Sequence, residues 1–246
     1  MRSGIGSRRG HFERWLAAAL AGAGLALGAS APACAADKAR RPKPAAPAPA
    51  PAEELAIPSA AATRVADWIA ASGDNRGLPY IIVDKQDAAL FLFDAKGKPI
   101  GRAPVLIGVA PGDEATPGIG SKNLAEIGPA EKTTPAGRFL AKYGMAAGKQ
   151  RVLWVDYATS VALHPIPPGA SKKERRRQRM LSPTPDDNRI TFGCINVPQA
   201  FYGKRVRPLF QRKGGYVYVL PDTKPIEAVF PRLRVQAVMS GGATGL

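Results

Sequence analysis

Residues 80–84 (YIIVD) and 89–94 (ALFLFD) decide the fold, because they are two short runs of aliphatic and aromatic side chains close together in the chain. Such residues favour the pleated backbone of a strand. Residues 95–98 (AKGK) read as a turn into a third run over residues 99–108. The stretch therefore predicts consecutive β-strands joined by tight turns.

Similar short runs recur at residues 138–143, 151–157, 159–164 and 215–220, with Gly and Pro between them. Repeated short strands separated by turn residues are typical of β-sandwiches and barrels. The prediction is a mainly β fold, a single sandwich-like domain over residues 78–222.

Helices are expected only at the margins of this domain. Val65, Trp68 and Ile69 share one helical face, which predicts a short helix and lead-in over residues 63–77. A second helix is expected from Pro198 to Val206, since proline suits the first turn. Residues 223–246 are expected to form a C-terminal extension.

The first 35 residues are typical of a signal peptide. Four arginines precede an uncharged stretch over residues 15–30, and Ala33-Cys34-Ala35 offers the small side chains of a cleavage site. The stretch is shorter than the roughly 20 apolar residues of a membrane span, which disfavours an anchor. Export to the periplasm or cell envelope is expected, and lipidation of Cys34 is the alternative.

Residues 36–62 are predicted to be a linker rich in proline and alanine. Residues 40–52 (RRPKPAAPAPAPA) favour an extended spacer with nothing to bury.

The chain is strongly basic. Its formal net charge is +16, and loss of the first 35 residues lowers it to +13. Such a charge favours anionic cell-envelope polymers as partners. Nucleic acid is not expected, because no basic motif interleaved with aromatic residues is present. Residues 171–179 (SKKERRRQR) read as a solvated loop or exposed helix, or else as a flap or docking patch beside a site.

Cys194 is the cysteine that remains after removal of the signal peptide, so no intramolecular disulfide is expected. A lone cysteine among apolar neighbours is often a small buried hydrophobe. Gly193 before it allows a sharp turn and offers a backbone amide to an oxyanion, and a helix from Pro198 would favour the thiolate. These features indicate a nucleophile.

His164 is the matching candidate base. It ends a strand-like run, and the further ligands that a metal site needs are absent from the sequence around it. A thiol with an ordinary pKa of about 8.5 needs a base or a cation beside it to react at neutral pH. Cys194 and His164 are therefore predicted to act together.

These residues resemble the L,D-transpeptidases, a family that cross-links peptidoglycan, over roughly residues 78–220. Residues 134–139 (TPAGRF) resemble its Thr-Pro-x-Gly-x-Phe element, and residues 82–93 its opening hairpin. Phe192 and Pro165 depart from the family pattern, as does the thirty-residue gap between histidine and cysteine. The active-site signature is matched at His164, Thr191, Gly193, Cys194, Ile195 and Asn196.

The resemblance implies two-step acyl transfer from peptidoglycan stem tetrapeptides on a largely β fold. Cys194 would be the nucleophile and His164 the general base or acid, with Gly193, Thr191 and Asn196 in supporting or oxyanion-binding roles. It implies no organic cofactor and no metal. A hydrolase on the same scaffold and a non-catalytic wall-binding module are the alternatives.

Overall fold

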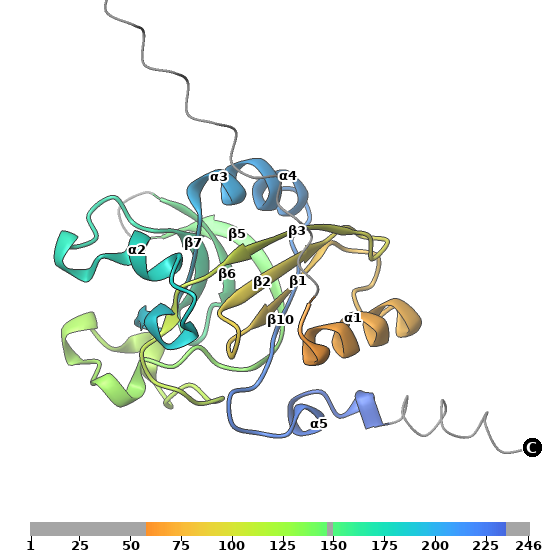
Figure 1. Ribbon diagram of the computed structural model, residues 1–246, viewed down its shortest axis with the longest axis horizontal. Helices are drawn as coiled ribbons and strands as arrows, with labels where there is room; N and C mark the ends of the chain where they lie inside the picture. The colour runs from red at the N-terminus through yellow and green to blue at the C-terminus, as the bar shows by residue number, and fades with distance from the viewer. Residues whose placement is uncertain (1–57, 147–149, 235–246) are drawn as a thin grey trace, which may run out of the picture. The chain divides into compact units, whose positions relative to one another are not determined.

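The computed structural model describes residues 58–146 and 150–234, and its main element is an eight-stranded mixed sheet (Figure 1). The strand order is β3-β2-β1-β10-β5-β6-β7-β9, and β4 pairs with β8 separately. The strands are β1 (Tyr80–Asp84), β2 (Ala89–Phe93), β3 (Pro99–Pro104), β4 (Ile107–Gly108), β5 (Gly137–Met145), β6 (Arg151–Asp156), β7 (Val161–Pro165), β8 (Arg189–Thr191), β9 (Ile195–Val197) and β10 (Gly215–Val219). The predicted mainly β fold is confirmed.

The opening hairpin lies inside the fold, because both faces of its strands are covered. In β1, Ile81 and Val83 pack into the larger apolar cluster, whereas Tyr80 and Ile82 pack into a second cluster on the other face. Strands buried on both sides have continuous apolar runs rather than an alternating pattern. This explains why the sequence YIIVD contains no polar residue before its last position.

Helix α1 (Ala60–Ser72) covers the second cluster with Val65, Trp68 and Ile69. It begins inside the expected linker, because the Ser59 hydroxyl accepts a hydrogen bond from the backbone N–H of Ala62 and caps the first turn. It ends at Gly73, whose φ of 64° is left-handed. The predicted boundary at residue 62 was therefore too late, and the helix is part of the folded domain.

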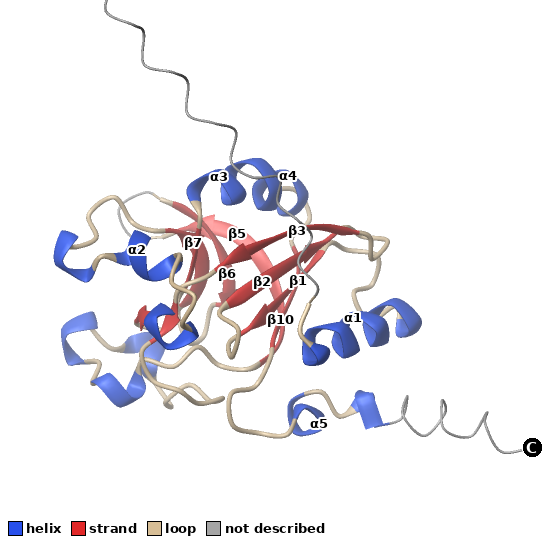
Figure 2. Ribbon diagram, in the orientation of Figure 1, coloured by secondary structure: helices blue, strands red, loops and turns tan. Residues whose placement is uncertain are grey.

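The expected C-terminal extension also contributes to the core as far as residue 234. Helix α5 (Ile226–Val229) is followed by Phe230 and Leu233, both buried in the second cluster. The rings of Phe230 and Trp68 lie 6.4 Å apart between centroids. Figure 2 shows α1 and α5 on the same side of the strands.

The run over residues 99–108 is divided between two sheets. Its first part is β3, and its end forms β4, which runs parallel to β8. Gly108 also lies close to the segment before Thr134, since a Cβ there would lie 2.2 Å from the backbone oxygen of Lys132. The division carries the chain from the opening hairpin to the segment that precedes Cys194.

The predicted second helix is present and longer than expected. Pro198 is its N-cap, and α3 (Gln199–Phe201), a π-helical turn (Tyr202–Val206) and α4 (Arg207–Phe210) follow without interruption. The predicted signal peptide and almost all of the linker lie outside the described residues. Within the described part of the chain, no helix has the length and apolar character needed to cross a membrane.

Candidate active site

The parallel pairing of β7 with β9 places the two candidate residues on adjacent segments of the chain. In this register His164 lies opposite Asn196, and Leu163 lies opposite Ile195. Successive side chains of a strand point to opposite faces. Leu163 and Ile195 are buried in the larger cluster, so His164, Asn196 and Cys194 share the other face.

His164 is held by hydrogen bonds on both ring nitrogens. Nδ1 lies 2.7 Å from the carbonyl oxygen of Pro165, and Nε2 lies 3.5 Å from Nδ2 of Asn196. A carbonyl oxygen only accepts, so Nδ1 carries the proton of the neutral ring and Nε2 is the basic atom. Burial lowers the pKa of His164, and the charge of Arg176 lowers it further against the opposing hydrogen bond to Pro165.

Cys194 is a half-buried free thiol at the start of β9. Its Sγ lies 3.7 Å from the carbonyl oxygen of Ser160. Burial raises its pKa, although a backbone hydrogen bond with Ala162 and the charge of Arg176 act in the opposite direction. Burial therefore disfavours the thiolate, so a base beside the thiol would assist its reaction. The contribution of the helix from Pro198 to a thiolate stays a prediction.

Thr191 and Gly193 shape the turn that presents Cys194. The Thr191 hydroxyl donates to the carbonyl oxygen of Cys194 at 2.6 Å and accepts from the backbone N–H of Gly193 at 3.1 Å. Gly193 has a φ of 120°, and a Cβ there would lie 2.7 Å from the backbone oxygen of Thr133. Only glycine fits this position without strain.

The backbone amides around Gly193 and Cys194 are the predicted oxyanion donors, and their hydrogen bonding differs. The N–H of Gly193 is already bonded to Thr191. By contrast, the backbone N–H of Cys194 has no hydrogen-bond acceptor among the described residues. The Cys194 amide is therefore the donor that this turn leaves available.

Thr134, in the segment TPAGRF, supports the turn from behind. Its hydroxyl donates to the carbonyl oxygen of Gly193 at 2.8 Å and accepts from the backbone N–H of Gly108 at 2.9 Å. In the sequence, this segment is recognisable only by its resemblance to the family element. The structure brings it into contact with the residue before Cys194.

Lys85 lies behind Thr134 and was missed by the sequence reasoning. Its Nζ donates to the carbonyl oxygen of Thr134 at 2.9 Å and to Asp113 Oδ1 at 3.0 Å, and it lies 3.3 Å from Asp222 Oδ2. Arg189 pairs with Asp222 at 2.8 Å. We call Lys85, Asp113, Asp222 and Arg189 the buried ion network. A lysine directly after an apolar strand is the one signal that the sequence carries for it.

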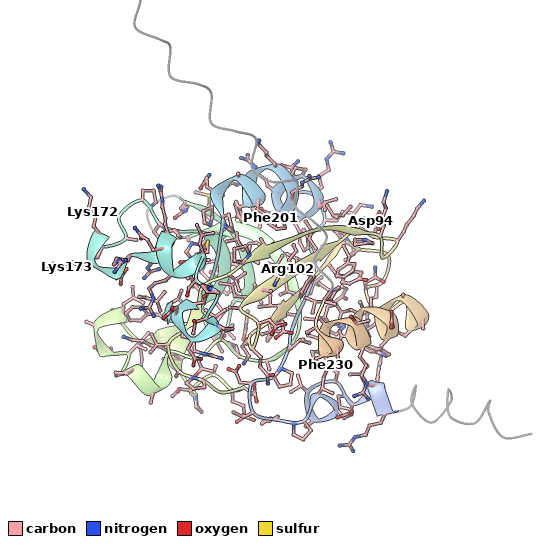
Figure 3. The ribbon with its side chains drawn as sticks, in the orientation of Figure 1. Asp94, Arg102, Lys172, Lys173, Phe201 and Phe230 are labelled. Atoms are coloured by element: carbon pink, nitrogen blue, oxygen red, sulfur yellow. The ribbon has the colours of Figure 1, made fainter. Side chains whose placement is uncertain are left out.

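The basic segment at residues 171–179 is only partly a solvated loop. It folds into a 3₁₀ turn (Lys172–Glu174) and helix α2 (Arg176–Met180). Lys172 and Lys173 project outwards in Figure 3. Arg176 instead donates from Nη1 to Asn196 Oδ1 at 3.0 Å. The segment therefore borders the site, and the purely solvated interpretation is wrong for Arg176.

Phe192 occupies the position of the second histidine of the resembled signature. Its side chain is 36% exposed, and Lys132 Nζ lies 3.9 Å from the centre of its ring. It points outwards and supplies no titratable group. Among the described residues, no group of three or more His, Cys, Asp or Glu side chains could hold a metal ion together.

Comparison with known proteins finds similar solved structures. No protein-family model matches the chain, and no curated protein matches it either. An L,D-transpeptidase from Xylanimonas cellulosilytica is 14% identical with a TM-score of 0.34, over 58% of this chain and 60% of that one. The catalytic domain of the E. faecium L,D-transpeptidase is 17% identical with a TM-score of 0.32, over 58% of this chain and 96% of that domain.

The helical cell shape determining protein Pgp2 from Campylobacter jejuni is 11% identical with a TM-score of 0.40, over 68% of this chain and 58% of that one. The matched region thus spans about three fifths of two of these three structures. The names of two of these structures contain the family that the sequence motif resembles.

Proposed function

We propose that this chain is a cysteine-dependent L,D-transpeptidase that acts on peptidoglycan stem tetrapeptides. The observation that carries the proposal is the pairing of β7 with β9, which puts His164, with a basic Nε2, opposite Asn196, two residues from the Cys194 thiol. A weakly acidic thiol beside a neutral base is a pair suited to nucleophilic acyl transfer. The motif TFGCIN around Cys194 supplies the substrate class by its resemblance.

The first step forms a thioester. The Asn196 amide, 3.5 Å from His164 Nε2, gives way, and Nε2 takes the proton of the Cys194 thiol while Sγ bonds to the carbonyl carbon between the L-centre and the terminal D-residue. The carbonyl electron pair moves to its oxygen, which accepts the backbone N–H of Cys194. When the carbonyl re-forms, the C–N bond breaks, and the departing amine takes the proton from His164.

The second step releases the enzyme. An amine on a neighbouring stem attacks the thioester carbonyl and gives its proton to His164. The C–S bond then breaks, and Cys194 leaves as a thiolate that recovers the proton from the imidazolium. If water attacks in place of the amine, the same site performs hydrolysis, so the acceptor separates transpeptidase from carboxypeptidase.

The test is acylation by a carbapenem, followed by mass spectrometry of the peptide that contains Cys194. Cys194→Ala should abolish acylation, while thermal unfolding stays close to that of the wild type. His164→Ala should slow acylation by about 10²–10⁴-fold, with partial recovery at alkaline pH as thiolate forms without a base. Acylation of His164→Ala at the wild-type rate across neutral pH would refute the pairing.

Incubation with purified wall tetrapeptides distinguishes the possible reactions. Cross-linked dimers support transpeptidation, trimmed monomers support hydrolysis, and no reaction of either kind supports a wall-binding module. We further propose that the chain is exported after cleavage behind Ala35. N-terminal sequencing of protein from the producing cell should then begin at Ala36, and retention of residues 1–35 would contradict this.

A further inference from the structure

Arg176 differs from the other cations of the basic segment. Its side chain is only 12% exposed, whereas Lys172, Lys173 and Arg177 are exposed to solvent. Glu174 holds the guanidinium on one side, accepting from Nε at 2.8 Å. Asn196 holds it on the other side, accepting from Nη1 at 3.0 Å. An arginine fork can satisfy both partners at once because its donors are rigidly spaced.

The contact with Arg176 determines which way the Asn196 amide faces. A guanidinium has donors and no acceptor, so the atom of Asn196 that it meets is the oxygen. The amide nitrogen is thereby turned towards His164 Nε2, at 3.5 Å. On the far side of the ring, Nδ1 is bonded to the carbonyl oxygen of Pro165. A chain of contacts thus runs from Glu174 through Arg176 and Asn196 to the basic nitrogen.

We infer that Arg176 is a positioning residue that acts through Asn196 to orient His164, and that the basic segment brings Arg176 to the site. The inference rests on the proposed function for the identity of the substrate. The reactivity of the Cys194 thiol measures the role of Arg176 independently of that substrate. Misplacement of a reacting group by about 1 Å is enough to lower a rate by about 100-fold. Loss of this support is therefore expected to have a measurable effect.

The charge of Arg176 should also affect how the reaction rate depends on pH. Arg176 acts on His164 and Cys194 together and is itself paired with Glu174. Its charge lowers the pKa of the imidazole and the pKa of the thiol. Removing the charge should raise both, so the acid limb of the rate profile should move to higher pH.

The experiment measures alkylation of Cys194 by iodoacetamide across pH, read on the peptide that contains this residue. Iodoacetamide is uncharged, so its rate reports activation of the thiol rather than attraction of an anion. Arg176→Met should react about 10–100-fold more slowly at pH 7 than the wild type. Arg177→Met, one residue along and exposed, should react within about twofold of the wild type, and thermal unfolding verifies that both are folded.

A double-mutant cycle tests the route through Asn196. If Arg176 acts through this amide, Arg176→Met added to Asn196→Ala should cause no further loss beyond Asn196→Ala alone. Arg176→Lys keeps the charge but loses the fork, so it should retain the pH profile while reacting more slowly. Independent, additive losses would overturn the inference, and so would equal alkylation rates in all variants.

The same variants treated with a carbapenem separate this inference from the proposed function. A wild-type protein that is alkylated but never acylated would refute the proposed function and leave the role of Arg176 intact. The inference would be overturned if Arg176→Met reacted more slowly with the anionic carbapenem but at the wild-type rate with iodoacetamide. Arg176 would then act by binding the carboxylate of the ligand.

Discussion

The turn at Cys194 is supported from two sides that differ in how they use charge. Behind it, Lys85 is fully buried and reaches the turn through the backbone of Thr134 and the Thr134–Gly193 hydrogen bond. In front, Arg176 is partly exposed and reaches the site through the side chain of Asn196. The buried ion network around Lys85 joins four separate segments of the chain, whereas Arg176 and its partner Glu174 belong to a single surface segment.

This difference separates stability from reactivity. A buried charge that loses its partner destabilises the whole fold, because the remaining charge stays desolvated. Arg176 retains some contact with solvent and pairs with the partly exposed Glu174, so its removal should cost less stability than that of a fully buried charge. We therefore expect variants behind the turn to unfold the protein and variants in front of it to change the rate of its chemistry.

The largest expected effect is that of Lys85→Met. Asp113 and Asp222 would be left close together and buried without their shared cation. The free energy of unfolding in urea should fall by about 3–5 kcal/mol. The matched control is Lys173→Met, at an exposed position, with an expected change within about 0.5 kcal/mol. Equal stability of the two variants would remove the contrast between the two supports.

Gly193→Ala should have the next largest effect, since Gly193 is the residue through which Thr134 supports the turn. The left-handed φ and the nearby Thr133 oxygen should cost about 1–3 kcal/mol of unfolding free energy. Acylation of Cys194 should also slow, because the turn must shift. Gly169→Ala is the control, as a Cβ there meets nothing within 4 Å. A wild-type rate and stability for Gly193→Ala would show that the turn tolerates another backbone geometry.

As the pH is lowered, the acylation rate should fall before the stability that depends on Asp113 is lost. The pKa of His164 is lowered by burial, so the acid limb of acylation should lie below the ordinary histidine value of about 6.5. Burial alone would raise the pKa of Asp113, but hydrogen bonds from Asp222, Lys224 and Thr223 lower it. Its contribution to stability is therefore present above the unfolded pKa, about 3.9, and is lost as pH falls below that value.

The measurement is the acylation rate and the urea midpoint on one pH series. Protonation of His164 favours the unfolded state in the same direction, because the unfolded chain binds that proton first. The rate should fall at a higher pH than the main loss of stability. A stability that falls no further below pH 4 would contradict the depressed pKa of Asp113.

The smallest expected effect is that of neutralising Arg175 and Arg177 together. Both side chains are exposed, so the fold and the acylation rate should stay unchanged. Retention on anionic wall material should weaken modestly at low salt. The deficit should disappear as salt rises, because exposed charges are screened within about 8–10 Å at physiological ionic strength. Unchanged retention at low salt would leave these arginines as solubilising charge only.

The sequence alone located most of the strands, because each depends on a local run of side chains, but β8 and β9 on either side of Cys194 were not predicted. The runs at residues 80–84 and 215–220 became neighbours β1 and β10, although nothing local predicts that they pair in parallel. The helix over residues 63–77 was located by its apolar face, and its start was missed because Ser59 lies outside that periodic pattern.

The pairing of Cys194 with His164 stays a prediction, and the sequence itself motivates it. After the expected cleavage each is the single residue of its kind, so scarcity itself pointed to the pair. Their protonation states were not predictable. Burial lowers the pKa of the imidazole and raises that of the thiol, and burial follows from how the folded chain packs around them.

The sequence by itself determined which residues are available: a thiol, an imidazole, a glycine before the thiol and a cluster of cations. Tertiary structure alone decided how they are used. It commits the Gly193 amide to Thr191, buries Lys85 behind Thr134, and selects Arg176 from its basic neighbours. The physical reason is that these contacts join segments far apart in the chain, through strand register and side-chain direction that no local pattern encodes.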